Sequence, residues 1–317
     1  MKSTFRVVIL VLGFGMLLIA VVIATGASLK SVFGFSNEDA RYGELQTHGV
    51  TQEIDTIEID ATERDLSVVL TDDEDPYVTY HEHADDTWVI REKDGVLRVE
   101  QNRRNRFRIF KAGFASRELR ELKIYLPREG EFSLNLRTRV GMIELAFTEV
   151  VAFEDLEVRS STGRIELKNI ETESDVRART KTGRIELESI TCSNLEVLVA
   201  TGDIDIESIT AESADLNSST GRIRMRDSAI TEEVFASNSV GDVEMTRVTA
   251  SVFDLESSTG SIEVVMDPDL SIEFDLKTNL GEVEVFGQVL GKRYITNTGD
   301  VRIKASVSTG SIRIKAA

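Results

Sequence analysis

The chain has 317 residues, and its 55 acidic residues outnumber 37 basic ones, which gives a formal net charge of −18. This acidic balance argues against nucleic acid as a partner, because binding to phosphate backbones requires a basic surface. The single cysteine, Cys192, cannot form an internal disulfide, and we interpret it as an unreactive surface or half-buried thiol.

The N-terminal part contains an apolar stretch, residues 7–29, which carries no charged side chain between Arg6 and Lys30. A stretch of this length can cross a bilayer as one helix. Lys2 and Arg6 precede it, so the positive-inside tendency predicts a cytoplasmic N-terminus at residues 1–6 and an exported remainder. The alternative is a cleaved secretory signal, which would leave the remainder secreted. We favour the uncleaved anchor because the stretch is longer than the apolar part of most signals.

The next two segments do not follow a fixed period. Residues 30–44 are expected to be a short tether. Residues 45–130 alternate apolar and polar positions, as in IDTIEID at 54–60 and TWVIRE at 87–92, which predicts irregular β-structure. A stacked repeat exposes an apolar layer at its end, so we predict that this β-rich region caps the repeats C-terminal to it.

Residues 131–317 repeat one short phrase, a glycine followed by alternating polar and apolar residues, with a period of about twenty residues. Apolar residues also recur seven and five positions before the glycine, so each repeat is predicted to be two strands joined by a tight turn. The sequence therefore predicts an all-β chain, a β-solenoid (β-helix) that follows a single-span helix. The turn glycines are Gly141, Gly163, Gly183, Gly202, Gly221, Gly241, Gly260, Gly281, Gly299 and Gly310.

Two further patterns concern the corners and the end of the solenoid. Small polar residues precede most turn glycines by three positions, as Ser160 does, and two roles are open for them. They could point inward and bond along the stack, or mark strand ends; we favour strand ends because buried polar groups need partners. The last glycine spacing is short, which predicts a hairpin-like finish, with Arg313 and Lys315 discouraging edge pairing on the last strand.

One outward face of the early repeats is basic. Stacking places equivalent positions of successive repeats in columns, and cations occupy these columns in three consecutive repeats. Such a face could hold anionic envelope polymer or lipid headgroups. The alternative is that the cations pair with acidic neighbours and form an ordinary solvated surface. The residues of this face are Arg137, Arg139, Arg159, Arg177, Arg179 and Lys181.

Enzymatic and metal sites receive little support. Asp203 and Asp205 share one strand face, as paired carboxylates do in glycosidases, but no long loops are present to build a cleft around them. His81 and His83 could begin a zinc site, but further ligands are not evident. We therefore expect no catalytic, cofactor or metal site. Outward charges alternate in sign between repeats, as in Arg224 after Asp205, and we expect ion-pair ladders there.

The serial TGxIxL phrases after an apolar N-terminal segment resemble the bacterial putative-adhesin family of β-strand-repeat envelope proteins, over residues 45–317. The resemblance implies a β-helical fold, an association with the cell envelope and no catalytic residues. We therefore expect a membrane-anchored, extracytoplasmic and non-enzymatic interaction surface. The alternative is an envelope-stress sensor or scaffold that acts through a protein partner.

Overall fold

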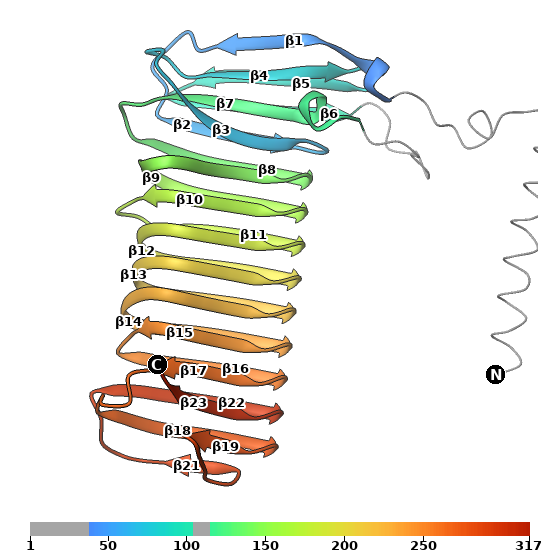
Figure 1. The fold of residues 1–317 in the computed structure, drawn as a ribbon. Helices are drawn as coiled ribbons and strands as arrows, with labels where there is room; N and C mark the ends of the chain where they lie inside the picture. The colour runs from blue at the N-terminus through green and yellow to red at the C-terminus, as the bar shows by residue number, and fades with distance from the viewer. Residues whose placement is uncertain (1–37, 104–114) are drawn as a thin grey trace, which may run out of the picture.

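The computed structural model describes residues 38–103 and 115–317. They form an all-β solenoid whose chain winds through stacked rungs of two strands each (Figure 1). The strands before the turn glycines make up the first sheet, and the strands after them make up the second sheet. The predicted solenoid is thus confirmed. Within the described ranges no helix is long and apolar enough to cross a membrane, and the segment predicted to do so, 7–29, lies outside those ranges.

Equivalent positions of neighbouring rungs pair in parallel, which confirms the predicted columns. Ile185, for example, pairs with Ile165 on one side and with Ile204 on the other. Four long strands bend around a corner and belong to both sheets. These are β9 (Ile143–Thr162), β12 (Ile185–Thr201), β13 (Ile204–Thr220) and β14 (Ile223–Val240). The single-sheet strands of this region are β8 (Phe132–Val140), β10 (Ile165–Glu171), β11 (Val176–Thr182), β15 (Val243–Thr249), β16 (Val252–Thr259) and β17 (Ile262–Met266).

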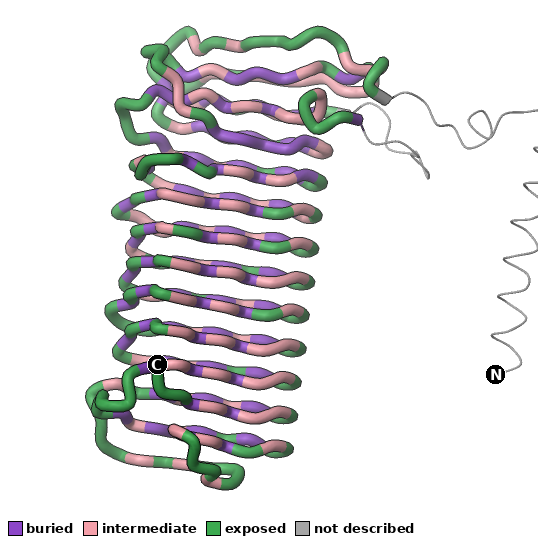
Figure 2. The backbone as a smooth tube through the Cα atoms, viewed as in Figure 1, coloured by how far each residue is buried: buried purple, intermediate pink, exposed green. Residues whose placement is uncertain are grey.

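The core is one continuous apolar column between the two sheets. Every rung contributes alternate residues to it, so short buried stretches recur along each strand (Figure 2). Leu195, Val197 and Val199 of the first sheet and Ile204 and Ile206 of the second are all at most 2 % exposed. This burial is what binds each rung to its neighbours, since a single rung has no core of its own.

The turn glycines stack directly upon one another. Gly202 has a φ of +136°, and a Cβ atom placed on it would lie 1.7 Å from the carbonyl oxygen of Gly183. Its neighbours along the column, Gly183 and Gly221, are in the same situation. Only glycine satisfies both the backbone conformation and this close approach. The glycine signal in the sequence is therefore a steric requirement of the stack.

The small polar residues three positions before the glycines bond along the stack, so the strand-end interpretation was wrong. Ser160 Oγ donates to the carbonyl oxygen of Gly141 at 3.1 Å, and Thr278 Oγ1 donates to that of Gly310 at 2.7 Å. Their side chains are buried, and the carbonyl of the adjacent rung supplies the partner that burial requires. Thr138 makes the equivalent bond to the Arg64 carbonyl oxygen. The bond to a turn-glycine carbonyl is also made by Thr180, Ser218, Asn238 and Ser257.

The opposite corner turns without glycine. Six residues after the turn glycine the backbone adopts positive φ, as at Ser189 (55°) and Ser208 (60°). Asn169, Asp227 and Arg247 hold the same place in other rungs. Residues with a side chain reach this conformation at a cost of about 1–2 kcal/mol each, which the packing of the rungs offsets.

The parallel stack extends further toward the N-terminus than residue 131, where the repeat pattern starts. Strands β2 (Thr56–Ala61) and β3 (Asp65–Thr71) form a rung that pairs with β8 and β9, although Arg64 occupies the glycine position. One more rung, β6 and β7, lies on it, and three antiparallel strands close this end (Figure 1). These elements are η1 (Glu38–Arg41), β1 (Tyr42–Gly49), β4 (Tyr77–His83), β5 (Asp86–Lys93), β6 (Val96–Arg103), α3 (Arg117–Arg120) and β7 (Glu121–Pro127).

The C-terminal strands do not form the end of the solenoid, so the predicted finish was wrong. Strands β22 (Val301–Thr309) and β23 (Ile312–Ala316) lie between β16–β17 and the outermost rung, which is β18 (Ile272–Leu280) with β19 (Val283–Val285). The short antiparallel strands β20 (Gln288–Val289) and β21 (Arg293–Ile295) cover that rung.

This insertion gives the C-terminal basic residues a different role from the one expected. Lys315 Nζ lies 2.8 Å from a Glu263 carboxylate oxygen, and Arg313 Nε lies 3.9 Å from one of Glu284, on the opposite side. They therefore pair with both neighbouring rungs and do not protect a free edge. Gly299 lies between β21 and β22, outside the glycine column, whereas Gly310 stacks on Gly260.

Candidate functional site: a basic hollow on the first sheet

A shallow hollow of about 620 Å³ opens on the outer face of the first sheet, over the early rungs. Stacking of β8, β9 and β11 brings the predicted basic residues together there. Five of the six line the hollow; Arg177 is the exception and pairs with Asp155, Asp175 and Glu196 beside it. The basic lining residues are Arg137, Arg139, Arg159, Arg179 and Lys181.

Three of these five cations are held by carboxylates of the same face. Arg137 and Arg159 share Glu157, and Arg137 Nη2 lies 3.7 Å from its Oε2. Arg179 Nη2 lies 2.5 Å from Glu196 Oε1. Arg137, Arg159 and Arg179 therefore pair with acidic neighbours, as the alternative interpretation of this face predicts. Their contribution to stability is small, about 0–1 kcal/mol for each exposed pair.

Arg139 and Lys181 differ from the other three. Both are exposed, and neither has an ion pair within the part of the chain that the structure describes. They stand at the same position of rungs two apart, with Ser161 between them, so about 10 Å separates their backbones. Two cations that are not neutralised by the protein can neutralise charges of a bound anion.

The floor of the hollow is partly apolar, a feature that the sequence analysis missed. Leu198 is 45 % exposed and stands in the column that holds Arg159 and Arg179 in the preceding rungs. Ala200 lies beside it on the same strand face. The sequence carries this signal as a leucine four positions before Gly202, where the three preceding repeats have arginine. The hollow thus combines cations with a surface for an apolar group.

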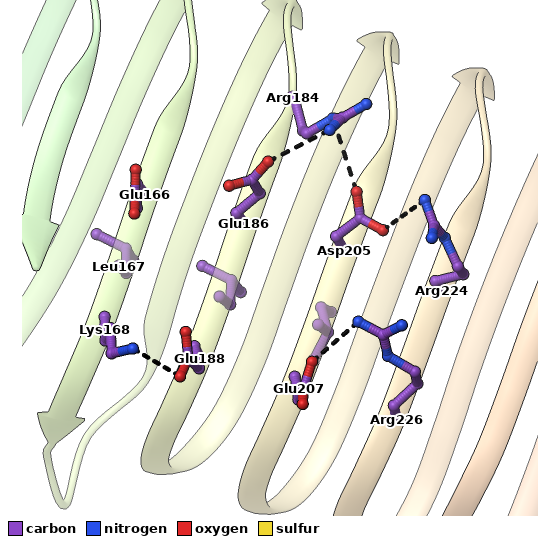
Figure 3. A pocket seen from close by; sticks show the side chains of 12 residues that line it. Glu166, Leu167, Lys168, Arg184, Glu186, Glu188, Asp205, Glu207, Arg224 and Arg226 are labelled. Carbon is purple, nitrogen blue, oxygen red and sulfur yellow. Dashed lines mark hydrogen bonds and ion pairs between the residues drawn. The ribbon is translucent and has the colours of Figure 1, made fainter.

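The outer face of the second sheet has a different character, because its charges neutralise one another (Figure 3). Arg224 Nη2 lies 2.9 Å from Asp205, and Arg226 Nη2 lies 2.9 Å from Glu207. Lys168 pairs with Glu188 at 2.7 Å. The expected ion-pair ladders are present, and each link joins adjacent rungs. This face is therefore a cross-linked surface with its cations already occupied.

The paired carboxylates that resemble a glycosidase site belong to this ladder. Asp203 accepts from the Arg222 backbone N–H at 2.9 Å and from Arg184 Nη2 at 3.0 Å. The backbone hydrogen bond from Arg222, followed by Arg184, lowers the pKa of Asp203. A general acid requires the opposite shift, and Asp205 is held by Arg224. These two residues form structural ion pairs.

The remaining candidates also have structural contacts. His81 Nδ1 lies 2.9 Å from the Gly43 carbonyl oxygen, and His83 is buried with its ring edge-on to Tyr42. Across residues 38–103 and 115–317, no group of three or more potential metal ligands is found. Cys192 is buried, and burial raises the pKa of its thiol to about 12, which keeps it protonated and unreactive.

Solved structures that resemble the chain include two described as adhesion proteins. A putative adhesin from Bacteroides fragilis shares 17% sequence identity, with a TM-score of 0.38 over 87% of this chain and 99% of the other. A putative cell adhesion protein from Clostridium sporogenes shares 12% identity, with a TM-score of 0.24 over 86% and 99%. No curated protein matches the sequence.

The family comparison covers more than half of the chain. Residues 54–269 match the family model described as Toastrack DUF4097. The match starts at the first parallel rung, β2–β3, and ends just before β18. It confirms the predicted membership in a family of β-strand-repeat proteins. The chain belongs to the Toastrack DUF4097 family.

Proposed function

We propose that the protein is a non-enzymatic binding protein of the bacterial cell envelope and that the basic hollow binds an anionic envelope ligand. The observation that carries this proposal is the convergence of five cations on one hollow, two of them without an ion pair among the described residues. A phosphate or carboxylate ligand would neutralise Arg139 and Lys181, and its apolar part would rest on Leu198. Anionic polymer and anionic lipid share this chemistry.

Reversing the two unpaired cations tests the proposal. We expect Arg139→Glu/Lys181→Glu to weaken co-sedimentation of the full chain, kept in non-ionic detergent, with purified bacterial cell walls. The expected loss is at least about tenfold at low salt, because two attractive charges become repulsive, and it shrinks as salt screens the face. Mixed micelles with phosphatidylglycerol measure the lipid source in parallel, and stronger binding there would identify lipid as the ligand.

The matched control carries the same change of charge at the far end of the solenoid. Lys292→Glu/Arg293→Glu alters two exposed cations beside the outermost rung and is expected to leave binding unchanged. An equal loss of binding in both variants would show that net charge alone controls binding, and this would contradict a defined site. Absence of binding to either probe would favour the alternative, a sensor or scaffold with a protein partner.

We further propose that residues 7–29 anchor the protein in the membrane with the solenoid outside the cytoplasm. The uncharged apolar stretch and the preceding Lys2 and Arg6 support this topology. Protease added to intact cells should then digest the accessible loops while the protein stays in the membrane fraction. Recovery of a shortened chain in the medium would indicate a cleaved signal, and protection of the solenoid in intact cells would contradict export.

A further inference from the structure

A two-ring stack lies on the outer face of the second sheet, near the capped end of the solenoid. The rings of Tyr77 in β4 and Tyr125 in β7 are parallel within 8°, with centroids 4.4 Å apart. The next strand, β1, pairs with β4 and places Gly49 opposite Tyr77. One ring face of Tyr77 is covered by Tyr125, and its other face is directed toward a position that has no side chain.

The space over Gly49 is open. A Cβ atom placed on Gly49 would meet nothing within 4 Å, and a hollow of about 520 Å³ lies there, lined by Gly49, Val50, Pro76 and Tyr77. Adjacent strands are about 4.8 Å apart, which is close to the ring spacing of the stack. A flat group over Gly49 would therefore form a third layer on Tyr77.

The rim of this hollow, which we call the slot over Gly49, is acidic. Asp73, Glu74 and Asp75 line it, on the turn that joins β3 to β4. The Asp73 carboxylate accepts a hydrogen bond from Thr71 Oγ1 at 2.8 Å, whereas Glu74 and Asp75 have no ion pair within the described part of the chain. An aromatic ring face carries partial negative charge, so the ring and the carboxylates both attract a cation.

The same chain contains a completed version of this arrangement a few strands away. The Arg64 guanidinium carbon lies 5.1 Å from the centroid of the Tyr42 ring, and Arg64 Nη2 donates to Asp86 at 2.9 Å. Ring, planar cation and carboxylate are all present there. At Tyr77 the ring and the carboxylates are present and the cation is missing from the described part of the chain.

We propose that the slot over Gly49 binds an arginine side chain of a partner polypeptide. The guanidinium is planar, so it can stack flat on an aromatic ring and pair with a carboxylate through two parallel hydrogen bonds. The lysine ammonium is a compact point charge without this planar fork. Within the described residues, strand β1 pairs along one edge only, with β4. Its other edge can therefore accept the extended backbone of the same partner.

The test measures binding of three blocked pentapeptides that differ only in a central arginine, citrulline or lysine. Citrulline keeps the planar shape without the charge, and lysine keeps the charge without the plane. We expect the arginine peptide to shift the NMR signals of the Gly49 amide in the full chain in non-ionic detergent. The other two peptides should bind at least about tenfold more weakly, because each lacks one component of the recognition.

Filling the slot provides the matched variants. Gly49→Leu places a side chain over Tyr77, at a position with room and without a positive φ, and should abolish arginine binding. Gly43→Leu makes the same change on the same strand, where a Cβ meets only an ordinary contact of 3.7 Å, and should retain binding. Undiminished binding by Gly49→Leu, equal binding of the citrulline or lysine peptide, or no binding of the arginine peptide would each overturn the proposal.

Discussion

Replacing Gly202 with alanine is expected to break the solenoid at its centre. The added Cβ would lie 1.7 Å from the Gly183 carbonyl oxygen and 2.6 Å from its carbon, so the two rungs must separate. The φ of +136° adds conformational strain of about 1–3 kcal/mol. Together these effects should cost about 5 kcal/mol or more, at the extreme of single substitutions.

The Gly202→Ala substitution should also change how the protein unfolds, because the solenoid is a linear stack of rungs. Each rung contacts only its neighbours, so a separated pair interrupts the hydrophobic column and divides it into two shorter stacks. Urea denaturation monitored by far-UV circular dichroism should show a lower midpoint and a broadened or divided transition. Limited proteolysis should produce a new cut near residues 183–202.

Gly291 supplies the control for the conformational part of the effect. Its φ is +84°, but a Cβ there would meet nothing within 4 Å. Gly291→Ala should therefore cost only the conformational strain, about 1–2 kcal/mol. A similar loss in both variants would show that backbone conformation alone, and not the contact between rungs, explains the glycine column.

The periodic part of the fold could be predicted because one physical rule repeats in every rung. A glycine at one corner of each repeat and an apolar residue at every second position, such as Ile204 and Ile206, recur through the periodic rungs. The partners of Ser160 and its equivalents were misjudged for a related reason. Their hydrogen-bond acceptor is a carbonyl of the neighbouring rung, and only the stacked structure provides it.

The ends could not be predicted from the repeat. Arg64 takes the place of a turn glycine, so the first rung, β2–β3, does not show the repeating phrase. At the other end, insertion of β22 and β23 depends on which strands leave an edge open, and a local pattern does not contain that information. In both places the arrangement is set by contacts between distant segments.

The sequence predicted which cations of the candidate site share a face, but it did not predict the hollow between them. Stacking alone placed Arg137, Arg159 and Arg179 on one face. Side-chain geometry decides which cations find a carboxylate partner. Among the described residues, Arg137, Arg159 and Arg179 have one and Arg139 does not. The slot at Tyr77 was missed because it arises across the antiparallel pair β1–β4, outside the periodic region.

The second large effect is expected where the cap meets the first rung. Arg64 is 1% exposed, and its guanidinium donates to Asp86 Oδ2 at 2.9 Å, to Tyr42 Oη at 3.0 Å and to the His81 carbonyl at 3.2 Å. Arg64→Met keeps most of the side-chain volume but removes the guanidinium from the buried Asp86 carboxylate. Breaking a buried ion pair in this way should cost about 3–5 kcal/mol.

The position of the single tryptophan makes this loss measurable at the cap. Trp88 lies in β5, with its ring 5.5 Å from the Arg64 guanidinium carbon and 4.8 Å from the Tyr80 ring. Its fluorescence therefore reports the capped end, whereas circular dichroism reports all rungs. In Arg64→Met the fluorescence transition should move to lower urea ahead of the dichroism transition, because the antiparallel strands separate before the rungs unfold.

Removing both charges distinguishes the ion pair from lost packing. Arg64→Met/Asp86→Leu removes the carboxylate together with the guanidinium, and replacement of a buried pair by apolar residues is often close to neutral. The double variant should therefore recover most of the stability that Arg64→Met loses, even though the hydrogen bonds from Arg64 to Tyr42 and His81 and from Gln101 to Asp86 are missing. If the double variant is as unstable as the single one, these hydrogen bonds hold the cap in place, and the charge of Asp86 contributes little.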